Sequence, residues 1–313
     1  MGKREKLQGQ IDPVLTELAQ GTENSPFSFI GPQIFPIVRS VVGHGKFAKM
    51  TREHFKLYDT KRARLAPTNL HSPNPIDGFE TFSCQERDFG YPIDYNETDG
   101  EVIDYERHAT FAVKHTLDIT REKEIADLLQ TTGNFTSGNT ASPSNKWSNI
   151  STSNPVADIR LAITTVRANT GIPVTGMCMA MGESAFMSLE NHPLILALLK
   201  TTDTKVVTPE LIAAIFRLQA VYVGSTVYDT DAGVITDVWG DNAIVYVKMP
   251  KSTTSLYTPG FGYIVTKPGY EKGPIIDRYP REGNKVDVVR GTTIDDILFH
   301  GQHAGYLISD VNA

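Results

Sequence analysis

Apolar residues recur at helical spacing within residues 101–131. Ala109, Val113 and Leu117 lie at four-residue intervals, so they share one face of a helix. Acidic residues crowd the start of this segment, where the helix dipole favours negative charge, and Gly133 follows its end. The pattern predicts one long helix over residues 101–131.

A second helix is marked by its ends as well as by its apolar face. Asn154 is a typical N-cap, Pro155 suits the first turn, and Gly171 suits the position after the last turn. These signals predict a helix between Pro155 and Gly171. Shorter apolar segments predict further helices at residues 183–189, 193–199 and 208–218.

Strand-like runs dominate the last third of the chain. Runs rich in β-branched and aromatic residues predict strands at residues 220–229, 238–248, 261–267, 285–291 and 295–300. The chain has no internal repeat. Because helices and strands do not alternate regularly, the fold class predicted is α+β.

The first 45 residues are interpreted as an extended arm. Prolines interrupt this segment and oppose a helix, while the apolar side chains between them demand burial. These apolar side chains are Phe27, Phe29, Ile34 and Phe35. We expect the arm to bury them against another part of the fold or against another chain.

Residues 46–90 are interpreted as a protruding hairpin. A long proline-rich loop at residues 67–80 interrupts the extended chain. The returning segment, residues 79–95, alternates apolar and polar residues. Long structureless loops are uncommon in compact domains, and those that occur are usually functional.

Charge is distributed unevenly along the chain. The whole chain has 30 basic and 36 acidic residues, yet residues 43–66 hold only two acids. The basic residues of this stretch are Lys46, Lys49, Arg52, Lys56, Lys61, Arg62 and Arg64. Three interpretations are open: a solvated face, nucleic-acid binding, and pairing with an acidic surface. Overall acidity opposes the second.

A candidate acidic partner lies at residues 94–106. Its acids are Asp94, Glu97, Asp99, Glu101, Asp104 and Glu106, and it holds no basic residue. A hairpin tip cannot easily reach back to the start of the helix that follows it. We therefore expect basic residues of one copy to meet the acidic segment of a neighbouring copy.

Motifs for catalysis are missing from the sequence. "GHGKFA" at residues 43–48 lacks the spacing of a phosphate-binding loop, and "MGESAF" at 181–186 lacks the second glycine of a nucleophile elbow. The eight histidines show no metal-ligand spacing, and Cys84 and Cys178 form no disulfide framework. The sequence predicts no enzyme activity, no cofactor and no metal site. It also shows no secretory signal, and no apolar run approaches the ~18 residues that a membrane span needs.

Several segments resemble the major capsid proteins of tailed bacteriophages. They occur in the expected order between about residues 11 and 250, and each is weak alone. They are "DPVLTELAQG", "FIGPQIFPIV", "GKFAKMTREHFKLYDTKRA", "REKEIADLL", "NPVADIRLAITTVRANTG", "NHPLILALLK" and "VVTPELIAAIF…VYVGSTVYDT".

The resemblance implies the Hong Kong 97-like capsid fold. Its parts would be an N-terminal arm (1–45), an extended E-loop hairpin (46–90), a peripheral domain (91–171) with the spine helix (101–131), an axial domain (172–248) and C-terminal strands returning to the peripheral domain (249–313). The implied function is a structural subunit that assembles into hexamers and pentamers of an icosahedral head around double-stranded DNA.

The resemblance also implies partners and a location. The chain would bind copies of itself and contact a portal protein at one vertex, a decoration protein in some heads, and packaged DNA without sequence-specific contacts. Because the arm begins close to Met1, a separate scaffold protein is expected. The location would be the virion, after assembly in the host cytoplasm. Two alternatives stay open: an encapsulin-type compartment shell and an intracellular α/β enzyme.

Overall fold

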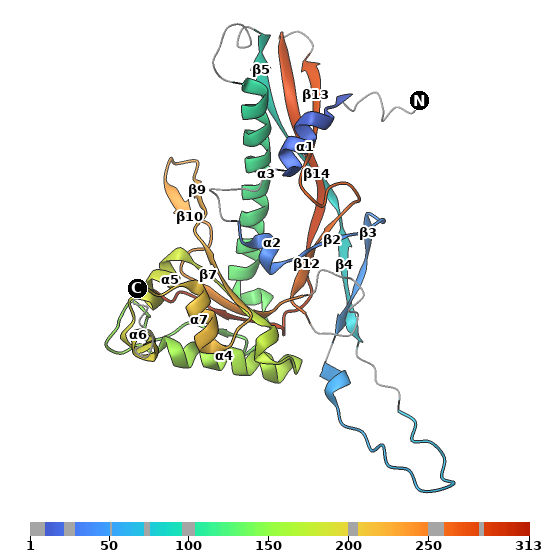
Figure 1. Ribbon diagram of the computed structural model, residues 1–313, viewed down its shortest axis with the longest axis vertical. Coiled ribbons are helices and arrows are strands. Elements are labelled where there is room, and N and C mark those ends of the chain that lie inside the picture. Colours follow the sequence, from blue (N-terminus) through green and yellow to red (C-terminus); the bar gives the residue numbers. More distant parts are fainter. Residues whose placement is uncertain are drawn as a thin grey trace.

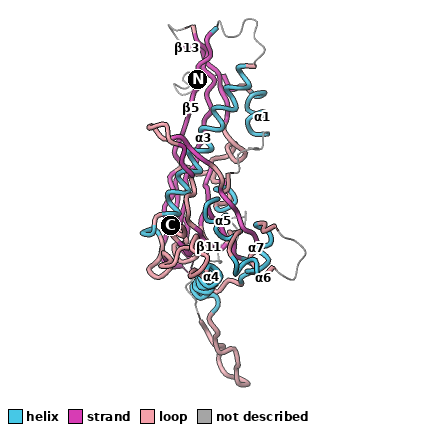
Figure 2. Tube along the Cα trace, turned by 90° about the vertical axis from the view of Figure 1, so that its left-hand side faces the viewer, coloured by secondary structure: helices cyan, strands magenta, loops and turns pink. Residues whose placement is uncertain are grey.

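The computed structural model describes residues 10–21, 29–50, 52–71, 76–95, 104–199, 206–249, 260–281 and 285–313. Within these ranges the chain forms an elongated α+β molecule with two larger β-sheets and two two-stranded sheets (Figure 1). A view turned by 90° shows the same elongated outline (Figure 2). The α+β class expected from the sequence is thus the class observed.

The predicted helices beyond residue 100 are present. The helices are α1 (Pro13–Gly21), α2 (Gly31–Ile34), α3 (Tyr105–Gln130), α4 (Pro155–Thr170), α5 (Glu183–Glu190), α6 (Pro193–Leu198) and α7 (Pro209–Phe216). The Asp104 carboxylate accepts from the Arg107 backbone N–H and caps α3. Asn154 caps α4 in the same way, and Gly171 ends it with φ of 74°.

The strands are more numerous than the sequence predicts. They are β1 (Gln10–Ile11), β2 (Ile37–Arg39), β3 (His44–Met50), β4 (Ile76–Ser83), β5 (Gln85–Asp94), β6 (Thr140–Ala141), β7 (Met177–Gly182), β8 (Ala220–Gly224), β9 (Val227–Asp229), β10 (Ile235–Asp237), β11 (Ala243–Val247), β12 (Gly262–Thr266), β13 (Ile275–Arg281), β14 (Val286–Phe299) and β15 (Gly305–Ile308).

The first larger sheet runs along α3. Its order is β1-β13-β14-β12-β2, and β5 pairs antiparallel with β14 over Gln85–Asp94. α3 packs on β5 and β14 through Ala109 and Val113, which are fully buried beside Ile276 and Val289. The long helix therefore runs along the long axis of the molecule (Figure 1).

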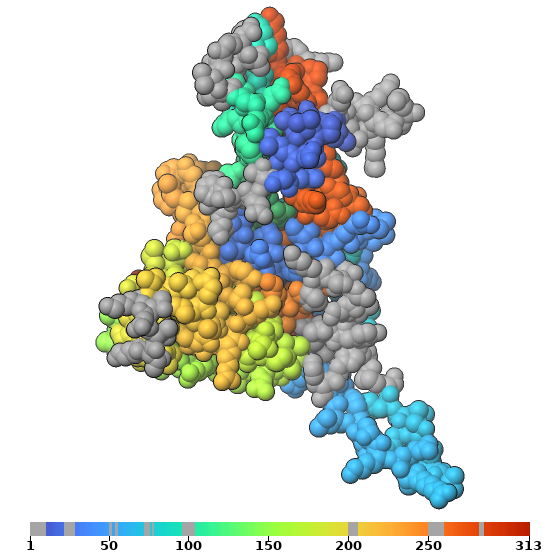
Figure 3. All heavy atoms as spheres, viewed as in Figure 1, coloured from blue at the N-terminus to red at the C-terminus, as the bar shows by residue number. Residues whose placement is uncertain are grey.

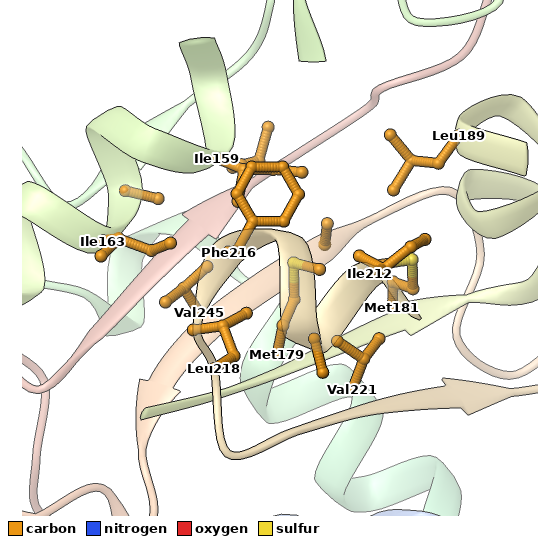
Figure 4. Packing of buried hydrophobic residues seen from close by; sticks show 14 of the residues in the cluster. Ile159, Ile163, Met179, Met181, Leu189, Ile212, Phe216, Leu218, Val221 and Val245 are labelled. Carbon is orange, nitrogen blue, oxygen red and sulfur yellow. The ribbon is translucent and has the colours of Figure 1, made fainter. Parts of the chain in front are cut away.

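The second larger sheet, β6-β15-β11-β7-β8, is buried on both faces. In β7, Met177, Met179 and Met181 face a cluster built with α4 and α7, shown in Figure 4. Cys178 and Ala180 face the opposite cluster, which includes the C-terminal half of α3. Strands buried on both faces lose the alternation of apolar and polar residues, which explains why the sequence did not reveal β7.

The expected domain boundaries differ from the packing in two places. α4, assigned to the segment 91–171, packs its apolar face against the second sheet together with β7, α5 and α7. The segment 249–313 divides, because β12, β13 and β14 join the first sheet whereas β15 lies in the second. The boundary expected at residue 171 therefore falls inside one packed unit.

The N-terminal segment is not simply extended. Asp12 accepts hydrogen bonds from the backbone N–H groups of Val14 and Leu15, and Pro13 begins α1. Ile34 and Phe35 are fully buried within their own chain, in a cluster with residues of α3 and β12. Of the two expected alternatives, these two side chains are thus buried against another part of their own fold.

Phe29 and Phe27 are the other two apolar residues of the arm that were expected to be buried. Phe29 is half-buried, and its ring lies 5.8 Å from that of His115 on α3. Phe27 lies outside the described residues.

Candidate functional site

The hairpin predicted for residues 46–90 is formed by β3 and β4. The strands pair antiparallel from His44 opposite Ser83 to Met50 opposite Ile76. At Cys84 the returning chain changes partner, since β5 pairs with β14 instead of β3. The single returning strand expected from the sequence is therefore two strands.

Apolar contacts attach the hairpin to the body of the molecule. Phe82 on β4 is 5% exposed, and its ring meets that of Phe47 edge-on at 5.5 Å. Phe82 packs in a cluster with Val38, Tyr263 and Val265 from the first sheet. We call β3, β4 and the 3-10 turn Arg52–Phe55 the hairpin base.

The basic residues nearest the base have partners in their own chain. The Lys49 ammonium lies 2.7 Å from the Glu80 carboxylate across the hairpin. The Arg52 guanidinium donates to the Ala168 carbonyl in the last turn of α4, at 2.6 Å. Lys56 pairs with Glu53, which raises the pKa of the lysine. These three residues therefore make intrachain contacts, and their expected intersubunit contacts stay a prediction.

The remaining basic residues are exposed. In the part of the chain that the structure describes, the side chains of Lys46, Lys61, Arg62 and Arg64 make no ion pair or hydrogen bond. All except Lys46 belong to residues 56–71, which we call the tip. Figure 3 shows the tip standing away from the rest of the surface. Lys61, Arg62 and Arg64 are thus available to a partner.

The tip also presents large apolar side chains to solvent. Leu57, Leu65 and Leu70 are 99%, 93% and 92% exposed. The Asn69 side-chain amide donates to the carbonyls of Asp59 and Lys61, which gives the loop internal order. An ordered loop that exposes three leucines among cations has the composition of a contact surface.

The described residues of the acidic segment lie at the opposite end of the molecule. β5 ends and α3 begins at the end farthest from the tip (Figure 1). Asp104 caps α3, and Glu106 forms an ion pair with Arg278, which also binds Asp287 at 2.7 Å. Asp94 ends β5, while Glu97, Asp99 and Glu101 lie outside the described residues. We call Asp94, Asp104 and Glu106 the acidic end.

Glu122 is a functional candidate that the sequence analysis missed. Its buried carboxylate on α3 accepts from the backbone N–H groups of Ile30 and Gly31, at 2.9 and 2.8 Å, and from the Trp239 indole at 2.7 Å. Burial raises the pKa of Glu122, and these donors oppose the rise. The carboxylate joins α3 to the N-terminal segment and to the turn between β10 and β11. Glu122 stands among other charged residues in "REKEIADLL", so no sequence signal distinguishes it.

The described ranges contain neither a metal-binding cluster nor a helix that could span a membrane. No group of three or more histidine, cysteine or acidic residues there could hold a metal ion. None of the helices in these ranges is long and apolar enough to cross a membrane. The prominent features are instead an exposed tip, an acidic end and an elongated frame that separates them. An exposed tip of this kind is typical of a surface that contacts other proteins.

Comparison with known proteins identifies the family. No family model matches the chain. The chain is 33% identical over 318 residues to the major capsid protein of Burkholderia phage BcepMu, and the match covers 100% of both. This protein therefore belongs to the phage major capsid proteins. It is a structural component of the virion that assembles with copies of itself, and it is not an enzyme.

Solved structures share the fold. A phage-related protein from Bordetella bronchiseptica matches with a TM-score of 0.76 at 21% identity, over 97% of this chain and 98% of that one. A chain of Mycobacterium phage Che8 matches with a TM-score of 0.54 at 13% identity, over 93% and 95%. A virus-like particle from Pyrococcus furiosus matches with a TM-score of 0.57 at 11% identity, over 97% and 98%.

Proposed function

We propose that this capsid protein builds an icosahedral head of hexamers and pentamers around double-stranded DNA, using the subdomains of the Hong Kong 97-like fold. In this assignment β3, β4 and the tip form the E-loop, α3 is the spine helix, and the second sheet with α4–α7 forms the axial domain. The first sheet and α3 form the peripheral domain. The fold shared with other phage proteins supports this proposal.

The contact between copies pairs the tip of one subunit with the acidic end of its neighbour. The observation that carries this proposal is the separation of the two charged regions at opposite ends of one elongated chain (Figure 1). Lys61, Arg62 and Arg64 cannot meet their own acidic end, so a neighbour must supply it. The three exposed leucines of the tip would be buried in the same contact.

Apolar burial would supply most of the energy of this contact. Burial of a leucine side chain contributes about 1.5–3 kcal/mol, whereas an exposed ion pair contributes about 0–1 kcal/mol. The ion pairs would set the register, because the contact repeats at every subunit boundary of the shell. The partners Asp94, Glu97, Asp99, Glu101, Asp104 and Glu106 would not contribute equally, since Glu106 already binds Arg278.

Other partners follow from the same proposal. The head would contact a portal protein at one vertex, use a separate scaffold protein, assemble in the host cytoplasm, and accept a decoration protein in some forms. The packaged DNA would make no sequence-specific contact. The net charge of −6 supports this last point, because an acidic subunit limits adhesion to packed DNA.

Charge reversal tests the subunit contact. Arg62→Glu, alone and with Arg64→Glu, is expected to lower the yield of shells at low salt while unassembled subunits stay folded. Arg160→Glu is a matched control, because Arg160 is also exposed but lies on α4, outside the tip. Shell yield is measured by light scattering and negative-stain imaging. Normal yield from the double variant at low salt would contradict the proposed pairing.

A second arm of the experiment tests the head architecture separately. Shells of the unmodified chain are imaged after expression with and without the scaffold protein of the same phage. Closed icosahedral particles are expected, whereas open sheets or tubes under both conditions would contradict the proposed architecture.

A further inference from the structure

A cavity of about 600 Å³ lies where the hairpin base meets the second sheet and α4. Its walls come from β3 and the turn that follows, the loop at residues 136–139, α4, and the turn between β14 and β15. The subunit contact proposed above does not use this cavity. The role of the cavity is therefore a separate question from the subunit contact.

The charged groups that line the cavity are cationic. Lys49 and Arg52 are the charged residues among the described lining residues, which include no carboxylate. The nearby Glu80 carboxylate offsets the charge of Lys49, at 2.7 Å. One N–H of the Arg52 guanidinium donates to the Ala168 carbonyl, and the guanidinium has four further N–H donors. The cavity therefore has a positive potential and spare donors.

Uncharged polar groups add to these donors. The side chains of Ser137 and Gln302 line the cavity and make no hydrogen bond among the described residues. The Asn169 amide donates to Asn139 at 2.8 Å, and this bond fixes one wall. A wall that is already hydrogen-bonded keeps its shape when a ligand enters, so less ordering is required on binding.

His300 supplies a buried polar atom beside the cavity. It is 6% exposed, and its ring stacks on Tyr263 and Phe47 at centroid distances of 5.8 and 6.3 Å. Its Nδ1 atom has no hydrogen-bond partner among the residues that the structure describes. Because Nδ1 is closed off from a water-sized probe, a molecule in the cavity would meet the ring of His300 and not this nitrogen.

We propose that this cavity binds a phosphate group, held by Arg52 and Lys49 with Gln302 and Ser137 beside it. The planar guanidinium of arginine matches two phosphate oxygens at once. A phosphate group has oxygen acceptors for each donor found here, whereas a cation would meet no carboxylate among the described lining residues. The group could belong to free inorganic phosphate or to a nucleic-acid backbone.

Calorimetric titration of the full-length, unassembled chain with sodium phosphate tests the site, with sodium chloride at equal ionic strength as the blank. Saturable binding to one site is expected. Arg52→Gln and Gln302→Glu should each weaken it by about tenfold or more, through a lost charged donor or an added repulsive carboxylate. Gln302 is exposed and makes no side-chain hydrogen bond among the described residues, so its variant tests the site without disturbing the fold.

Arg62→Gln is the matched control, because it removes the same charge from the same hairpin but lies in the tip. It should bind phosphate as tightly as the unmodified chain. The absence of saturable binding, an equal loss in Arg62→Gln, or equal displacement of phosphate by acetate would each overturn the proposal. The last result would indicate a site for carboxylates.

A short DNA duplex distinguishes the two sources of phosphate. If the duplex displaces inorganic phosphate and its own binding depends on Arg52, the site accepts a nucleic-acid backbone. If the duplex fails to compete while phosphate binding keeps its dependence on Arg52, the site accepts free phosphate. Both results support a phosphate site. Shell formation is not the readout, so failure here is distinguishable from failure of the proposed subunit contact.

Discussion

The base and the tip of one hairpin use similar basic residues in different ways. At the base, Lys49 and Arg52 contact Glu80 and the end of α4, and Phe82 is almost fully buried. At the tip, the exposed side chains of Arg62 and Arg64 make no ion pair or hydrogen bond among the described residues. A run of positive charge in a sequence can thus contain two surfaces with separate roles: one that attaches a hairpin to its own subunit, and one that is free for another.

The largest expected difference between the two regions is in subunit stability. Phe82→Ala should lower the free energy of unfolding by about 3–5 kcal/mol, because it removes a buried aromatic ring from a packed cluster. Leu65→Ala at the tip should change it by less than about 0.5 kcal/mol, because Leu65 is 93% exposed. Denaturant unfolding of unassembled subunits measures both values. Equal effects would show that the tip also packs on its own subunit.

Acidification tests the packing beside the base, where the ring of His300 stacks on Phe47 of β3. Burial first, and then the charge of His303, lower the pKa of His300 from 6.5 to about 4. Lys49 also lowers it, while Glu80 and a backbone contact at Leu298 raise it. The unfolded chain therefore binds a proton between pH 6.5 and about 4 that the folded chain does not bind.

The consequence is that stability falls as the pH decreases through this window. The contribution of His300 is fully present above pH 6.5, and about 3 kcal/mol is lost once the pH is below 4. Unfolding measured from pH 7 to 4 should show a smaller decline in His300→Gln than in the unmodified chain. Parallel declines in the two proteins would contradict the buried, neutral state of His300.

Local signals in the sequence were sufficient for several helices. The caps Asp104 and Asn154 and the terminal Gly171 place the ends of α3 and α4 within a few residues, because capping depends on neighbouring backbone groups. The same type of signal, Asp12 before Pro13, marks α1.

Strand pairing could not be predicted in the same way. β14 is one strand of 14 residues, whereas the sequence predicts two strands around Gly291. A Cβ atom at Gly291 would lie 2.5 Å from a methyl group of Val113, so the glycine allows α3 to approach the sheet. In the sequence, a glycine suggests that a strand ends. In the structure, Gly291 lies within β14 and leaves room for α3 to pack on the strand.

Only part of the candidate site could be predicted, because contacts between distant segments leave no local signal in the sequence. Composition alone shows a basic stretch and an acidic stretch, and the order of elements predicts a hairpin between the arm and the long helix. The sequence cannot show that Lys49 and Arg52 have intrachain partners, since Ala168 is more than a hundred residues from Arg52. Nor can it show Glu122, whose partners Ile30 and Trp239 come from distant segments.

The smallest expected difference concerns single charges in the two regions. Arg52→Ala should lower the free energy of unfolding by about 1 kcal/mol, because it removes one hydrogen bond from an exposed guanidinium to the Ala168 carbonyl. Arg62→Ala should change it by less than about 0.5 kcal/mol, since the described residues give it no partner to lose. Denaturant unfolding of the two variants side by side measures this difference. A larger loss in Arg62→Ala than in Arg52→Ala would reverse the assignment of base and tip, and Arg62 would then have a role within its own subunit.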